Sequence, residues 1–247
     1  MKLLRVVGTL ILVSVWWSIS ASGWINPILL PSPQAIAIEV FHFVSSVGSL
    51  LDLWLSTKRI LIAFALSILI GVPLGMILGL VKPLANLFEF PIDFFRSLPA
   101  TALFPLFMLF FGVGDESKLI LVIFASSLIT LLYAMYGVKN CSAIRLRAAK
   151  AMRLKGFEMF YHIVLPESLP NIVSGIRISL SLVLVLVVVL EMFTGNTSGI
   201  GKRIYDTSQM FRIKEMYAAI VIVGILGYTL NKLVTLIDSK FVHWAGR

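Results

Sequence analysis

Residues 140–171 read NCSAIRLRAAKAMRLKGFEMFYHIVLPESLPN and form a basic interval between two strongly apolar runs. The first half predicts a short helix, because Ile144, Ala148, Ala151 and Met152 recur at i, i+4, i+7 and i+8 and so share one face. Gly156 is expected to end this helix. A helix of this length is not stable alone in water, so we expect it to lie in a groove of this protein or of a partner.

The second half of the interval begins another apolar stripe. Phe157, Phe160, Tyr161 and Val164 follow the helical spacing i, i+3, i+4 and i+7. Two prolines come next, and Pro166 and Pro170 are expected to end this stripe and to direct the chain into the following membrane run.

Composition indicates a membrane protein. The 247 residues are 59% hydrophobic and only 13% charged, with a mean hydropathy of +0.98, whereas a soluble domain carries about a quarter charged residues. The net charge of +9 is better explained by cytoplasmic loops than by nucleic acid, because basic residues concentrate on the inner side of the membrane. The single cysteine, Cys141, excludes an internal disulfide.

Six apolar runs predict an all-α, polytopic fold that forms one transmembrane domain over residues 1–247, with its core spans in 56–238. The predicted inside loops hold twice as many Lys and Arg residues as the outside loops, which indicates that both termini are inside. We read the first run as a retained span rather than a cleaved signal peptide. The expected spans are Val6–Ala21, Ile60–Val81, Ser97–Val113, Leu119–Tyr136, Val173–Phe193 and Met216–Ile237.

The segments between the spans carry further predictions. Ala35–Leu55 is expected to be an amphipathic helix at the membrane interface, and Lys82–Arg96 a short inside loop. Pro99 and Pro105 in one span predict a broken or bent helix. Such breaks either line a transport pathway or are simple kinks, and both interpretations stay open.

No residue pattern predicts catalysis, and no cofactor or metal is expected. The three histidines are scattered without metal-ligand spacing, and no phosphate-binding glycine loop appears. Glu191 lies near the outer end of an aliphatic span, where it is either a gate in a translocation path or a carboxylate bonded to a neighbouring helix end. Gly199 and Gly201 follow in the adjoining outside segment, 194–214, and are candidate path residues with Glu191.

In order and spacing, these pieces resemble the membrane-spanning permease of an ATP-binding-cassette (ABC) importer of the binding-protein-dependent class, in the branch for nitrate, sulfonates, taurine, bicarbonate and thiamine precursors. The likeness covers nearly the whole chain. It rests on Leu30-Pro31-Ser32-Pro33, Ser56-Thr57-Lys58-Arg59, Gly71-Val72-Pro73-Leu74-Gly75 with Gly79, Arg96-Ser97-Leu98-Pro99, Phe111 to Lys118 (FGVGDESK), Leu165-Pro166 with Pro170, Gly175 and Arg177, Glu191-Met192, and Ser198-Gly199-Ile200-Gly201.

The resemblance gives residues 140–171 a role, because this loop carries the family's EAA signature, whose short helix docks onto a cytoplasmic ATPase. Arg147-Ala148-Ala149 stands where Glu-Ala-Ala is usual, and Arg153 stands where a glycine is usual. Since arginine adopts a positive φ at a cost, the helix is expected to run on to Gly156. The coupling residues implied are Ile144, Arg147, Ala148, Ala149, Met152, Arg153 and Gly156.

The resemblance implies an inner-membrane subunit that is not an enzyme. Its partners would be a cytoplasmic ATP-binding subunit, a periplasmic or lipid-anchored substrate-binding protein, a second permease copy and membrane lipid, without nucleic acid. Lys202, Arg203, Arg212 and Lys214 are expected either to face acidic patches of the binding protein or only to orient their loop. Two alternatives stay open, namely a basic helix bound to anionic lipid and a channel or secondary transporter that needs no ATPase.

Overall fold

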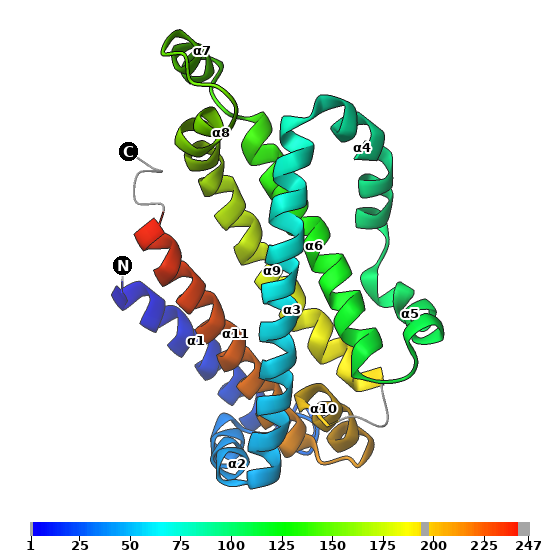
Figure 1. Cartoon of the computed structure of the whole chain (residues 1–247). Coiled ribbons are helices and arrows are strands. Elements are labelled where there is room, and N and C mark those ends of the chain that lie inside the picture. Colours follow the sequence, from blue (N-terminus) through cyan, green and yellow to red (C-terminus); the bar gives the residue numbers. More distant parts are fainter. Residues whose placement is uncertain (1, 194–197, 242–247) are drawn as a thin grey trace. The chain divides into compact units, whose positions relative to one another are not determined.

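The computed structural model describes residues 2–193 and 198–241, and every regular element in those residues is helical. Residues 194–197, at the start of the expected outside segment 194–214, and residues 242–247 lie outside the described residues. The elements are α1 (Lys2–Ala21), α2 (Pro33–Ser45), α3 (Val47–Leu80), α4 (Lys82–Ser97), η1 (Ala100–Leu103), α5 (Phe104–Phe111), α6 (Asp115–Lys139), α7 (Ala143–Ala151), α8 (Gly156–Met159), the π-helical η2 (Phe160–Val164), α9 (Leu165–Phe193), α10 (Ile200–Gln209) and α11 (Ile213–Phe241) (Figure 1).

Membrane-crossing helices confirm the polytopic all-α prediction. Within the described residues, four helical stretches are long and apolar enough to cross a membrane: Val47–Leu80, Asp115–Lys139, Gly156–Phe193 and Ile213–Leu236. A fifth candidate is the pair Lys82–Ser97 and Ala100–Phe111, bent by 92°. The first expected span, Val6–Ala21, is helical but shorter than these, and about 20 apolar residues are needed to cross the hydrocarbon core.

The chain forms two compact units. The first contains residues 2–56 and 191–226, and the second contains residues 57–190 and 227–241. In the first unit, Ser32 caps α2 by accepting a hydrogen bond from the Ala35 N–H, and α2 buries Ile36 and Phe43, one heptad apart. The Trp16 ring of α1 stacks on Tyr217 of α11, with ring centroids 6.4 Å apart.

The second unit is built around α6, which is in contact with α3 on one side and α9 on another (Figure 1). Three glycines one turn apart permit the close approach of α3. A Cβ atom on Gly71, Gly75 or Gly79 would lie 1.9–2.6 Å from atoms of Thr130, Leu131 or Val138 on α6. Glycine therefore serves here for the close packing of two helices.

Residues 82–96 are not the inside loop that the sequence predicted but most of a helix, α4. Pro83 lies in its first turn, where no N–H donor is needed. Ile92 joins Leu131, Leu132 and Met135 of α6 in a buried cluster. Charged residues between two apolar runs are typical of a loop, but here they belong to a helix.

Two other boundaries differ from the prediction. The expected interfacial helix over Ala35–Leu55 is two helices, because Ser46 is extended and separates α2 from α3. Pro166 and Pro170 do not end the apolar stripe, since the helical chain continues from Gly156 to Phe193. The π-helical turn η2 directly precedes Leu165-Pro166, and such turns let a helix accommodate a residue that lacks an N–H.

Candidate functional site

The carboxylate of Glu167 anchors the start of α7 to α9 within the second unit. Glu167, in the first turn of α9, accepts a hydrogen bond from the Ser142 backbone N–H at 3.2 Å and pairs with Arg145 Nη1 at 2.9 Å. The first contact satisfies a free donor at the start of α7. The two contacts together fix the N-terminal end of α7 to the end of a membrane-crossing helix.

The inner face of α7 belongs to the protein's own core. Ala149 is fully buried, and Leu146 packs against a cluster of Met76, Ala134, Val138, Val164 and Ile172 from α3, α6, η2 and α9. Ala149, which the resemblance assigned to ATPase contact, therefore contacts this chain instead. Leu146 of α7 thus packs against a cluster drawn from three membrane-crossing stretches.

The outer face of α7 is apolar and exposed. The side chains of Ile144 and Met152 are 78% and 65% exposed, and Ala148 and Arg147 are exposed beside them. Phe157 of α8 and Tyr161 of η2 are also exposed and stack on each other, with ring centroids 6.1 Å apart. The structure thus separates the predicted face (Ile144, Ala148, Met152) from the inward-facing Ala149.

Arg153 adopts the conformation that a glycine would supply. Its φ is 62°, whereas α7 ends at Ala151 and Met152 is its C-cap. The expectation that the helix would run on to Gly156 was wrong, because tertiary anchoring of α7 outweighs the modest cost of a left-handed arginine. Gly156, with φ of 52°, begins α8 rather than ending α7.

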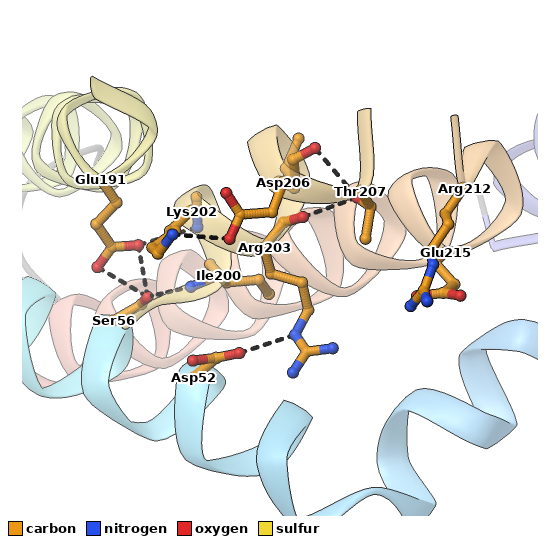
Figure 2. A network of polar contacts seen from close by, with 12 residues as sticks. Asp52, Ser56, Glu191, Ile200, Lys202, Arg203, Asp206, Thr207, Arg212 and Glu215 are labelled. Carbon is orange, nitrogen blue, oxygen red and sulfur yellow. Dashed lines mark hydrogen bonds and ion pairs between the residues drawn. The ribbon is translucent and has the colours of Figure 1, made fainter. Parts of the chain in front are cut away.

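A buried carboxylate organises the polar network of the first unit (Figure 2). Glu191 is fully buried. The Ser56 hydroxyl donates to its carboxylate, with Oγ 2.7 Å from Oε2 and 2.9 Å from Oε1, and the Gly201 N–H donates to Oε2 at 3.0 Å. The Ile200 N–H donates to Ser56 Oγ at 2.8 Å. Glu191 and Ser56 therefore cap the N-terminus of α10, where a negative charge is favourable.

Gly199 completes this network by leaving room for the carboxylate. A Cβ atom on Gly199 would lie 2.5 Å from the Glu191 carboxyl carbon. Glu191, Gly199 and Gly201 are thus brought together as the sequence suggested. Their geometry matches the interpretation of Glu191 as a carboxylate bonded to a helix end, and a gating role for the three stays a prediction.

The basic residues of α10 and of the turn after it are engaged within the first unit (Figure 2). Lys202 pairs with Asp206 at 2.8 Å, Arg203 with Asp52 at 2.8 Å, and Arg212 with Glu215 at 3.5 Å. The Arg203 guanidinium also lies over the Phe43 ring, 5.6 Å from its centroid. Arg203 therefore holds α10 against α2 and α3.

Pro99 and Pro105 lie at the bend between α4 and α5, as the two prolines predicted. Leu98, before Pro99, is extended, because the proline ring disfavours the helical conformation of the preceding residue. Pro105 lies in the first turn of α5, where it starts a helix rather than breaking one. The bend is 92°, and whether it lines a pathway stays a prediction.

Comparison with known proteins identifies the family of this chain. A family model described as "Binding-protein-dependent transport system inner membrane component" matches residues 71–243. The chain belongs to this family. The matched region includes α7, the bend at Pro99 and the Glu191 network apart from Ser56.

Individual relatives agree with the family. The taurine transport system permease protein TauC of Escherichia coli (strain K12) is 27% identical over 97% of this chain and 89% of its own length. The aliphatic sulfonates transport permease protein SsuC of the same strain is 30% identical over 94% of this chain and 88% of its own length. The inward-facing MetNI methionine ABC transporter shares the fold, with a TM-score of 0.65 over 80% of this chain and 96% of that chain at 18% identity.

Family membership confirms the predicted function at the level of class. The protein is a multi-pass inner-membrane permease subunit of an ABC importer, and the family is a transport component rather than an enzyme. It implies an ATPase and a substrate-binding protein as partners.

Two contributing residues were not singled out by the sequence. Glu167 was not predicted, because nothing in the local sequence indicates that this carboxylate pairs with Arg145, 22 positions earlier. The sequence identified Ser56 only as part of the Ser56-Thr57-Lys58-Arg59 motif. Its contact with Glu191 joins residues that are 135 positions apart.

Proposed function

We propose that α7 is the coupling helix through which a separate ATPase drives this permease. ATP binding would close two cytoplasmic subunits, and α7 would carry their movement into α3, α6 and α9 through its buried contacts. The path would then alternate between open to the outside and open to the inside, delivering a small polar solute that the binding protein brings.

The exposed apolar face of α7 carries this proposal. Ile144 and Met152 are largely exposed, although the opposite side of the same short helix is packed and ion-paired. An apolar patch beside basic residues on a rigid helix is typical of a helix that enters a groove of a partner. Arg147 lies on this side, where the family usually has a glutamate. The ATPase surface that it faces would therefore be acidic.

The substrate class is inferred from the relatives. Because the names of two relatives specify taurine and aliphatic sulfonates, small sulfonates are the first solutes to test. We further propose that two copies of this chain pair in one transporter with two ATP-binding subunits. Residues 140–171 would then place two coupling helices on the cytoplasmic side.

The test places a charge on the outer face of α7. Ile144→Glu and Met152→Glu should each reduce ATP-driven sulfonate uptake and the amount of ATP-binding subunit that copurifies by about tenfold, since a central interface contact contributes more than 1 kcal/mol. Lys150→Gln is the matched control, because Lys150 is exposed on α7 but outside the apolar face. Native mass spectrometry of the same preparations counts the permease copies.

Unchanged copurification in both glutamate variants would contradict the docking role. If the variants instead lost binding to vesicles of anionic lipid, α7 would be a lipid-bound helix. Ala149→Glu is not suitable for this test, because its side chain would enter the core of the second unit.

A further inference from the structure

Helix α4 carries a continuous polar stripe along one exposed side. Each member lies three or four residues from another along the chain, with Arg96 and Ser97 both following Asp93 at these spacings, so they line up along the helix. All are exposed, and Arg96 pairs with Asp93 at 3.2 Å with both side chains about half exposed. The stripe consists of Lys82, Asn86, Glu89, Asp93, Arg96 and Ser97.

The other sides of α4 are apolar. Ile92 is buried against α6, and Ala85 is also buried. Leu87, Phe90 and Phe94 are large and exposed on a third side. The stripe therefore lies between a packed side and an apolar side, and it is not simply the solvent side of a surface helix.

Contacts with α6 place the second half of the stripe, from Glu89 onward, at membrane depth. Ile92 clusters with residues as far along α6 as Met135, and the Phe95 ring lies 5.4 Å from that of Phe124. These 11 positions span about 16 Å of helix axis, roughly half of the hydrocarbon thickness. Because α6 crosses from Asp115 to Lys139, the contacts cover its central part.

Charged side chains at that depth are costly against lipid and need water or a polar partner. Helix breaks in transporters occur where the chain lines a cavity, and α4 ends at the 92° bend before η1 and α5. We propose that the α4 stripe lines the water-filled part of the translocation path.

The charges of the stripe indicate what can pass. Two carboxylates, Glu89 and Asp93, lie between two cations, Lys82 and Arg96, so the stripe has no net charge at neutral pH. Such a surface allows a hydrated polar solute to move past, whereas a binding site for an anion concentrates cations. Selection of the solute is then left to the binding protein. The stripe starts on the side of α7, since Gly79, just before α4, packs against Val138 near the end of α6.

Thiol labelling tests this inference, which rests on the proposed transport cycle. In the Cys141→Ser background, Asn86→Cys and Ser97→Cys place thiols at two uncharged stripe positions. Leu87→Cys and Phe94→Cys are the matched controls on the apolar side. The complete transporter, with ATPase and binding protein, is reconstituted in vesicles and treated with a membrane-impermeant sulfonated maleimide, then with a lipophilic maleimide.

We expect the impermeant reagent to label stripe cysteines at least about tenfold faster than control cysteines, because the reactive thiolate forms only in contact with water. The lipophilic reagent should label all four. Trapping with ATP and vanadate should change the stripe rates several-fold, because the path changes its side of opening. Control rates should stay constant.

Three results would overturn the inference. Stripe rates no faster than control rates would place the stripe against lipid. Equal stripe rates in both nucleotide states would indicate a helix lying in bulk water at the membrane surface. Oxidative cross-linking of Ser97→Cys between two permease copies, without labelling, would indicate a dry contact with the second copy. ATP-driven uptake by the Cys141→Ser protein is measured in the same vesicles, and its absence would count against the proposed function instead.

Discussion

Cys141 lies outside the membrane-crossing helices, in the short connection between α6 and α7, and its surroundings suppress ionisation. Its Sγ donates to the carbonyl oxygens of Gly137 at 3.6 Å and Val164 at 3.8 Å. Burial raises the pKa of the thiol from 9.0 to about 11, and the nearby Glu167 carboxylate adds to this, while Arg145 opposes it. The native protein therefore favours the neutral thiol.

This shift predicts slow alkylation of Cys141. At pH 8 the folded protein should react about 100-fold more slowly than a thiol of ordinary pKa, because a difference of two pKa units lowers the thiolate fraction by that factor. Since the folded pKa lies above the unfolded value, the associated stabilisation is complete below about pH 9 and is lost as the pH rises to about 11.

Measuring maleimide reaction rates from pH 7 to 11 checks both statements, with protein unfolded in detergent as the control. The rate for the unfolded protein should be half-maximal near pH 9 and level off above about pH 10, whereas the native rate should still be rising at pH 11. A native rate with its midpoint near pH 9, like that of the unfolded protein, would show that the α6–α7 connection is open to solvent.

Arg153 shows why single residues at turns are hard to predict. The sequence aligned it with a glycine position, and the cost of a positive φ favoured a longer helix. The structure instead keeps the turn and places arginine in it, with φ of 62°. The cost of about 1–2 kcal/mol is smaller than what the Glu167 contacts and the burial of Leu146 and Ala149 together contribute, and none of these contacts is visible from local sequence.

At the scale of elements, α10 is positioned by its N-terminus. Its first two N–H groups are bound by Ser56 and Glu191, and Arg203 pairs with Asp52 one turn before Ser56 on α3. Helix ends normally leave such donors to water or to a cap. The buried Glu191 carboxylate strengthens the attachment of α10. Its position requires that residue 199 have no side chain.

Gly199→Ala should therefore destabilise the protein by about 1–3 kcal/mol, because the added methyl group displaces Glu191 and leaves buried donors unpaired. Gly224→Ala in α11 is the matched control, since a Cβ atom there meets nothing within 4 Å and alanine favours a helix. Thermal unfolding of the purified protein measures both. Equal melting temperatures for Gly199→Ala and wild type would show that the Glu191 network accommodates the added methyl group without loss of stability.

Long apolar helices were the part of the fold that the sequence predicted well, because their composition alone distinguishes them. Helix α4 was not predicted, although its polar stripe follows the same helical period, because charged residues between two apolar runs are also typical of a loop. Contacts such as Ser56 with Glu191 could not be predicted, since they join positions far apart in the chain. The face of α7 was identified correctly at Ile144, Ala148 and Met152, but its inner side at Ala149 was not distinguished.

At the scale of the whole molecule, function depends on which side of the membrane each segment faces. The excess of basic residues in alternate loops predicts that α7 faces the cytoplasm, and ATP-driven coupling requires this orientation. The segment that follows α10 must then face the opposite side, where the binding protein acts. Lys150 on α7 and Lys214 at the start of α11 are exposed and report on these two sides.

Lys150→Cys and Lys214→Cys, each in the Cys141→Ser background, test the orientation directly. An impermeant maleimide should label Lys150→Cys in inside-out vesicles and not in right-side-out vesicles, and Lys214→Cys should show the reverse. The charge lost at each position is one of 21 basic residues, so the loop bias that sets the orientation is retained. Labelling of Lys150→Cys from the outside would place α7 away from any cytoplasmic ATPase, and the coupling proposal would then have no physical basis.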